Sequence, residues 1–221
     1  MKKQRLSTGR ALVRTVAGNQ LGDAIFDLAE VALDQNLPEG VLKATPVVST
    51  LVKLARMGQA VFEELHLRKL ENFLVELNAV SVEEREILLE RYPDSSEEQR
   101  VLGENLLLVL ERLDDIKKPA ILARFFAAYI RSEIDYLTFT RLARALERFN
   151  VELLPHLRRF YTPVEPFMEA SEDIIHELSL AGLVTVSLKH SGLISGSASY
   201  CSSELGKTFL RIGFGVQPSA S

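Results

Sequence analysis

Leu106-Leu107-Leu108-Val109-Leu110 is an unbroken run of large aliphatic residues in the middle of the chain. A helix that is apolar on every side is normally surrounded by other helices. Ser95-Ser96-Glu97-Glu98 precedes the run as a capping box, which marks a helix start, and Asp114-Asp115 follows it as a helix end. We therefore predict that this segment is the central helix of a multi-helix bundle.

Helical spacing continues on both sides of this run, from Asp23 to Phe160. Ser81-Val82-Glu83-Glu84 is a second capping box, and Lys118-Pro119 opens a helix with a wide apolar face. A further amphipathic helix extends as far as Phe149. These patterns predict a mainly α-helical fold, with a bundle over residues 23–162.

Pro163 and Pro166 interrupt the helical pattern, so the bundle is expected to end near Thr162, before a smaller C-terminal unit. In that unit Gly182 ends a helix and precedes an alternating pattern typical of a strand. The predicted order is helix, strand, loop, strand and helix, over residues 171–181, 183–188, 189–196, 198–201 and 204–212. The unit therefore covers residues 163–213 with one short β-hairpin, and residues 214–221 form a loose tail.

Two stretches flank the predicted glycine-containing loop: Leu180-Ala181-Gly182-Leu183-Val184 and Tyr200-Cys201-Ser202-Ser203-Glu204-Leu205-Gly206-Lys207-Thr208-Phe209. Together they resemble the winged-helix pattern, over about 45 residues. In DNA-binding members of that family, the helix before the wing enters the major groove and presents Arg, Lys, Asn or Gln to base edges. The corresponding helix here has no Lys or Arg, so DNA reading by this helix is disfavoured. Its acids are Glu169, Glu172, Asp173 and Glu177.

The helical middle contains Leu102-Gly103-Glu104-Asn105-Leu106 and Phe125-Phe126-Ala127-Ala128-Tyr129-Ile130. In these stretches it is similar to small helical proteins of bacteria and their phages that lack an assigned activity. That resemblance implies a helical fold and no particular function.

The chain has 221 residues, of which 47% are hydrophobic and 25% charged, a balance typical of a globular protein with a packed core. Its formal net charge of −4 argues against a bulk attraction for nucleic acid or an anionic membrane. The single Cys201 cannot form an internal disulfide, and no uncharged run reaches the roughly 18 residues of a spanning helix. We expect a cytoplasmic protein without a membrane span.

Residues 1–22 contain basic side chains and no acid, which predicts a basic, flexible arm. Two interpretations are open, a solvated tail and a tether to phosphate or acidic lipid. The basic residues are Lys2, Lys3, Arg5, Arg10 and Arg14.

Four motifs suggest chemistry, but each lacks a required part. Gly206-Lys207-Thr208 matches the end of a P-loop, yet the first glycine of that motif is replaced by Cys201. His176 follows Glu172 at a metal-binding spacing without a second histidine, and Ser195 lacks the nucleophile-elbow pattern. Asp114-Asp115 fits turn and capping roles. We predict no catalytic, cofactor-binding or metal-binding residues, and hence no enzyme.

Charge is distributed unevenly along the chain. Residues 63–114 hold 14 acids and 6 bases, whereas residues 117–159 hold 9 bases and 4 acids. Within the basic region, Arg141, Arg144 and Arg148 lie at helical spacing and form a basic stripe. The stripe either pairs internally, with acidic helices or with Glu147 and Glu152, or forms a docking face for an acidic partner.

The predicted function is a non-enzymatic protein-interaction or regulatory protein whose partner is another protein. Its candidate contact residues are Arg141, Arg144, Arg148, Glu169, Glu172, Asp173 and Glu177. The alternative is a nucleic-acid-binding, winged-helix transcriptional regulator, which would use the basic arm, the basic stripe and the wing. The candidate contact residues of its C-terminal unit are Lys189, His190, Lys207 and Arg211.

Overall fold

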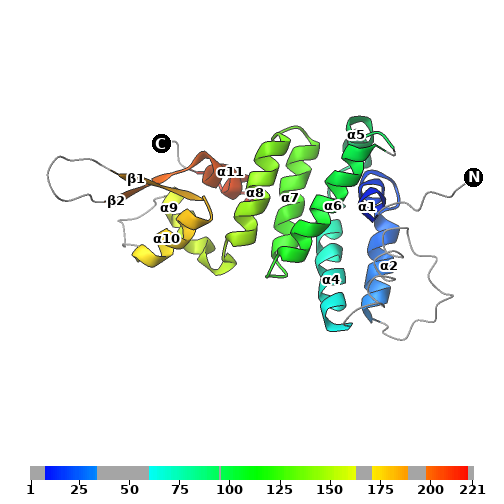
Figure 1. The fold of residues 1–221 in the computed structure, drawn as a ribbon, viewed down its shortest axis with the longest axis horizontal. Helices are drawn as coiled ribbons and strands as arrows, with labels where there is room; N and C mark the ends of the chain where they lie inside the picture. Colours follow the sequence, from blue (N-terminus) through cyan, green and yellow to red (C-terminus); the bar gives the residue numbers. More distant parts are fainter. Residues whose placement is uncertain (1–7, 34–59, 95, 163–170, 189–197, 219–221) are drawn as a thin grey trace, which may run out of the picture. The chain divides into compact units, whose positions relative to one another are not determined.

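A computed structural model describes residues 8–33, 60–94, 96–162, 171–188 and 198–218. The chain divides into two compact units, residues 1–133 and residues 134–221. The described residues are mainly helical, and their two strands pair in one antiparallel hairpin near the C-terminus (Figure 1). This confirms the predicted fold class.

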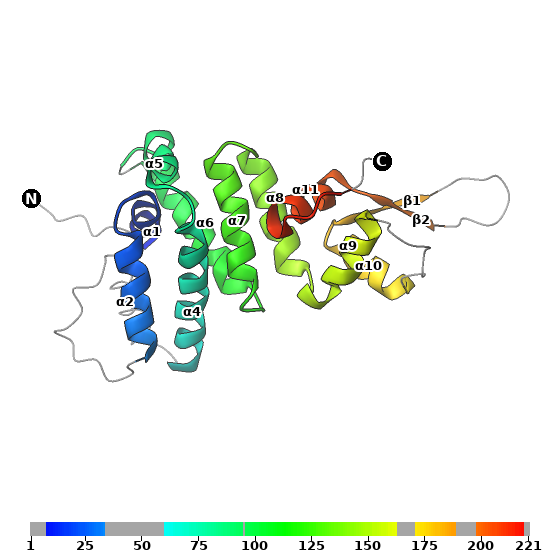
Figure 2. The same ribbon diagram turned by 180° about the vertical axis from the view of Figure 1, so that it is seen from behind.

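The first unit is helical throughout its described part. Helix α1 packs on α5 and α6, and α2 and α4 lie side by side in both views (Figures 1 and 2). Helix α4 also packs on α7. The helices are α1 (Thr8–Ala17), α2 (Leu21–Leu33), α4 (Ala60–Leu77), α5 (Val82–Arg91), α6 (Glu97–Arg112) and α7 (Lys118–Ile130).

Helix α7 is buried over nearly all of its length, and the prediction that the Leu106–Leu110 segment is the central helix is wrong. In α6 the buried residues Leu102, Leu106 and Leu110 recur every four positions and therefore share one face. Leu108 points away from that face and is 47% exposed. An unbroken run of aliphatic residues thus forms an amphipathic helix, whereas nearly all of α7 between Lys118 and Ile130 is buried.

Replacing Leu110 with aspartate should destabilise the first unit by about 3 to 5 kcal/mol, because a carboxylate would be buried without a partner. Leu108→Asp is the matched control on the same helix, and its cost should stay within about 0.5 to 1 kcal/mol because Leu108 is exposed. Urea denaturation followed by far-UV circular dichroism measures both. Equal losses would contradict the assignment of the buried face of α6.

The predicted flexible arm is wrong for its described residues, since α1 is a buried helix. Leu12 and Val16 are fully buried, and Ala11 and Val13 nearly so. Helix α1 crosses α6 very closely, because a Cβ built on Gly103 would overlap the carbonyl oxygen of Gly9. Residues 1–7, which include Lys2, Lys3 and Arg5, lie outside the described part of the chain.

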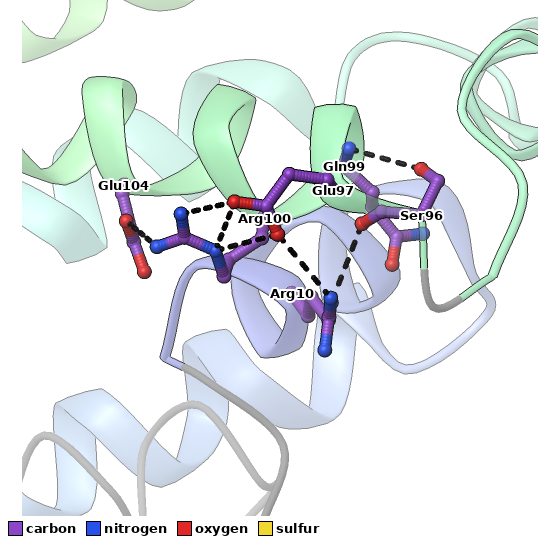
Figure 3. Close-up of polar contacts among 6 residues, drawn as sticks. All are labelled: Arg10, Ser96, Glu97, Gln99, Arg100 and Glu104. Atoms are coloured by element: carbon purple, nitrogen blue, oxygen red, sulfur yellow. Dashed lines mark hydrogen bonds and ion pairs between the residues drawn. The ribbon is translucent and has the colours of Figure 1, made fainter.

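Arg10 of α1 binds the start of α6 (Figure 3), and Arg14 binds the loop before it. The Arg10 Nε donates a hydrogen bond to the Ser96 carbonyl at 3.4 Å, and its guanidinium lies 3.8 Å from the Glu97 carboxylate. The Arg14 Nε donates to Asp94 Oδ1 at 2.8 Å, and this hydrogen bond lowers the pKa of Asp94 below its ordinary value. Both positive charges are therefore engaged inside the unit.

Side-chain caps define the starts of α5 and α6 in the first unit. Ser81 and Glu84 form the predicted capping box of α5. The cap of α6 is Ser96, whose hydroxyl accepts a hydrogen bond from the Gln99 N–H at 3.1 Å. Ser95, the first residue of the second predicted capping box, lies outside the described residues.

The second unit combines helices with the hairpin, in the predicted order. Helix α11 lies beside α8, and α10 packs on β1. The hairpin register pairs Val184 with Ser202 and Leu188 with Ala198. The elements are α8 (Tyr136–Arg148), a 3-10 turn (Val151–Leu153), α9 (Leu154–Tyr161), α10 (Glu172–Leu180), β1 (Val184–Leu188), β2 (Ala198–Ser202) and α11 (Glu204–Phe214).

Aromatic residues tie the helices on either side of the proline segment into one unit. The ring of Phe149, just after α8, packs edge-on against Phe209 and Phe214 of α11, with ring centroids 5.3 and 6.5 Å away. The Tyr161 hydroxyl, at the end of α9, donates a hydrogen bond to the Leu183 carbonyl. The predicted boundary near Thr162 therefore lies inside the second unit, which begins at Ile134.

Candidate interaction surface

Helix α8 orients the predicted basic stripe. The Asp135 carboxylate caps the helix by accepting a hydrogen bond from the Thr138 N–H at 2.7 Å. Hydrogen bonds from Thr138, with a smaller contribution from the positive charge of Arg141, hold the pKa of Asp135 below its ordinary value. Phe139, Leu142 and Leu146 are buried, so the helix turns its opposite face to solvent.

The basic stripe, Arg141, Arg144 and Arg148, lies on that solvent-facing side, and all three residues are exposed. Their spacing of three and four residues places them on one face, over about 10 Å of helix length. Leu137, one turn before Arg141, continues the same face and is 65% exposed. The exposed face thus has an apolar residue at its N-terminal end and three guanidinium groups after it.

The basic stripe has few polar contacts among the described residues. Within the described part of the chain, the side chains of Arg144 and Arg148 have no hydrogen bond or ion pair. The interaction found for Arg141 is the electrostatic one with Asp135. Glu147 and Glu152, the acids of the internal-pairing interpretation, each take part in an interaction of their own, while the three arginines stay exposed.

Helix α10 carries the opposite charge. Glu172, Asp173 and Glu177 are all exposed, and we call them the acidic stripe. Ile175 and Leu178 form the buried face that fixes this orientation. The fourth predicted acid, Glu169, lies outside the described residues.

Leu180, at the C-terminal end of α10, is 61% exposed. It follows Asp173 by seven residues and Glu177 by three, and it therefore shares their face. Leu180 and Leu137 were not among the contact residues predicted from the sequence. The available signal was the helical spacing that joins each leucine to its charged stripe.

The alternative nucleic-acid contacts are only partly described. Lys207 Nζ pairs with Glu204 at 2.9 Å on α11, and Arg211 is exposed one turn later. Lys189 and His190 lie outside the described residues. The arginines of α1, which this alternative also needed, bind Ser96, Glu97 and Asp94 in the first unit.

Two buried lysines, Lys69 and Lys118, bind acceptors at the end of α6, next to Asp114-Asp115. The Lys118 ammonium pairs with Asp114 at 2.5 Å, and the Lys69 Nζ donates to the Glu111 carbonyl at 3.0 Å. Burial lowers the pKa of Lys69, although the charges of Asp114 and Glu111 oppose the shift. Asp115 accepts a hydrogen bond from the Lys117 N–H at 2.7 Å. Asp115 thus has the predicted turn role, whereas α7 begins without a side-chain cap.

The described residues contain no group of three or more His, Cys, Asp or Glu side chains that could hold a metal ion. In the same part of the chain, no helix is both long and apolar enough to cross a membrane. Comparisons with protein-family models, with curated proteins and with solved structures found no match for this chain. Charge and exposure on α8 and α10 are therefore the observations that bear on function.

Proposed function

We propose that this chain is a non-enzymatic interaction protein that binds an acidic protein surface through the basic stripe of α8. The observation that supports the proposal most is the exposure of three arginines on one face, two of which have no side-chain partner in the described part. Guanidinium groups bind carboxylates through paired, charge-assisted hydrogen bonds. A row of three selects an acidic partner and accelerates its association. The single exposed Cys201 is compatible with the expected cytoplasmic location.

A protein partner is favoured over nucleic acid by the charge of the rest of the unit. The acidic stripe places three carboxylates on α10, where they would repel a phosphate backbone. The net charge of −4 adds to that repulsion at long range. A protein surface can present separate acidic and basic areas and so tolerate both stripes.

The test uses a fluorescently labelled poly-glutamate peptide as the acidic probe. Fluorescence anisotropy at about 50 mM salt should show binding, and Arg141→Glu/Arg144→Glu/Arg148→Glu should weaken it at least about tenfold. Arg158→Glu/Arg159→Glu/Arg211→Glu is the matched control, because it reverses three other exposed arginines of the same unit and changes the net charge equally. Equal binding by the wild type and the basic-stripe variant would refute the proposal.

A second candidate function is a winged-helix regulator that binds nucleic acid. The observation that favours it is the order of α8, α9 and α10 followed by the hairpin and α11, as in the winged-helix pattern. Reversing Glu172, Asp173 and Glu177 should then strengthen binding of a labelled DNA duplex, and Lys189→Glu should abolish it. We expect a gel shift at about 50 mM salt to show no duplex binding by the wild type or by the acidic-stripe variant. A gain in affinity from the acidic-stripe variant would favour the regulator instead.

A further inference from the structure

We propose that the acidic partner of the basic stripe is the acidic stripe on α10 of a second copy of this chain. The proposal rests on the function proposed above and names the partner of the same site. It commits to a self-association in which α8 of one copy packs antiparallel against α10 of the other.

Charge complementarity is the first observation. The exposed positions of the basic stripe are Arg141, Arg144 and Arg148, and those of the acidic stripe are Glu172, Asp173 and Glu177. Helix α10 contains no Lys or Arg that would oppose an approaching guanidinium. The basic stripe thus presents three charges on one face, and Asp173 and Glu177 of the acidic stripe present two on the face of Leu180, with Glu172 at its edge.

The positions along the two helices also match. With a rise of about 1.5 Å per residue, Arg141 and Arg144 lie about 6 and 10.5 Å beyond Leu137. On α10, read from its C-terminal end, Glu177 and Asp173 lie about 4.5 and 10.5 Å from Leu180. An antiparallel pairing that sets Leu137 against Leu180 therefore brings Arg141 to Glu177 and Arg144 to Asp173.

The two leucines, Leu137 and Leu180, add an apolar contact to the ion pairs. Exposed ion pairs contribute only about 0.2 to 1 kcal/mol each, because water and salt screen them. Leu137 and Leu180 are 65% and 61% exposed, and contact between them would remove apolar surface from water at one end of both stripes. Ion pairs next to such a contact would be partly shielded from solvent.

The basic stripe and the acidic stripe of one chain, all of whose residues the structure describes, form no ion pairs with each other. Helix α8 packs on α11 and α10 packs on β1, while the residues of both stripes remain exposed. Each copy therefore offers one donor face and one acceptor face, and a two-fold axis would use both contacts in a closed dimer. The proposed contact involves only one face of α8 and one face of α10, and interfaces below roughly 1,200 Å² are typical of transient association. We therefore expect a dimer that dissociates on dilution.

Sedimentation velocity of the full chain, at concentrations up to about 0.5 mM, tests the proposal. The wild type should dimerise at about 50 mM salt and dissociate at about 500 mM, because screening weakens the ion pairs. Arg141→Glu/Arg144→Glu/Arg148→Glu and Glu172→Arg/Asp173→Arg/Glu177→Arg should each be monomeric under the same conditions. Circular dichroism checks that both remain folded, and Arg158→Glu/Arg159→Glu/Arg211→Glu should dimerise like the wild type.

An equimolar mixture of the two stripe variants is the decisive sample. One variant carries two acidic faces and the other two basic faces, so a mixed dimer should form although neither variant associates alone. A mixture that remains monomeric, or dimerisation retained in either variant, would overturn the proposal. If the wild type is monomeric throughout but still binds poly-glutamate through α8, the partner is another acidic protein and the proposed function stands. A wild type that neither dimerises nor binds poly-glutamate would overturn both proposals.

Discussion

Replacing Gly103 with alanine should separate α1 from α6 and unfold the first unit. A Cβ at this position would overlap the backbone of Gly9, and backbone atoms cannot move aside as the end of a side chain can. The reverse substitution meets the same obstacle, since a Cβ at Gly9 would lie 2.6 Å from the Arg100 carbonyl oxygen. The two glycines thus allow a helix crossing that no larger residue permits.

We expect Gly103→Ala to cost at least about 3 kcal/mol, because separating the helices also exposes the buried side chains of α1. Gly22→Ala is the matched control, since nothing lies within 4 Å of a Cβ there. It should stabilise α2 by about 0.5 to 1 kcal/mol through the higher helix propensity of alanine. Urea denaturation measures the change in the free energy of unfolding of each variant, and the two changes should have opposite signs. A Gly103→Ala chain as stable as the wild type would show that the helices do not cross here.

Local signals predicted the element types well. The capping box at Ser81, the left-handed Gly182 at φ 76° and the alternation before Leu188 each depend on a few neighbouring residues, and the structure has the expected feature at each place. Features that depend on distant neighbours were missed. The Gly9–Gly103 crossing joins segments far apart in the chain, and neither residue alone indicates that its partner is a glycine.

The error about α1 has a physical cause. Residues 1–22 were interpreted from their charge, but Leu12 and Val16 are one turn apart and form the buried face. The arginines lie outside that face, where Arg10 and Arg14 reach acids of the first unit. A basic helix and a basic arm have the same composition, and the apolar spacing was the signal that distinguished them.

The basic stripe could be predicted from the sequence, but whether its arginines pair with acids of the same chain could not. Helical spacing is sufficient to place Arg141, Arg144 and Arg148 on one face. Whether an acid meets that face depends on which helices pack beside α8, and no local pattern specifies this. The neighbouring helix α11 packs through Phe209 and Phe214 next to Phe149, and the three arginines stay exposed on α8.

The second unit depends on one buried hydroxyl, that of Tyr161. It donates a hydrogen bond to the Leu183 carbonyl before β1 and accepts one from the Ser203 N–H at 2.9 Å. The Ser203 hydroxyl caps α11 by accepting from the Gly206 N–H at 2.9 Å. A Cβ on Gly206 would overlap both the Tyr161 hydroxyl and the Leu183 carbonyl oxygen. Helix α9, strand β1 and helix α11 therefore meet at Gly206, where only a glycine fits.

Gly206→Ala should consequently unfold the second unit, at a cost of at least about 3 kcal/mol, because α11 cannot approach β1 without expelling Tyr161. Tyr161→Phe removes the hydroxyl without adding volume and should cost about 1 to 3 kcal/mol, since the Ser203 N–H loses a buried partner. Two-dimensional NMR during urea denaturation separates the two units, and both variants should lower the midpoint for residues 134–218 while leaving that of residues 8–133 in place. Lys207→Ala, which removes only the ion pair with Glu204, is the control on α11 and should cost no more than about 1 kcal/mol. If Gly206→Ala cost no more than Lys207→Ala, the hydroxyl of Tyr161 could not be the junction of α9, β1 and α11.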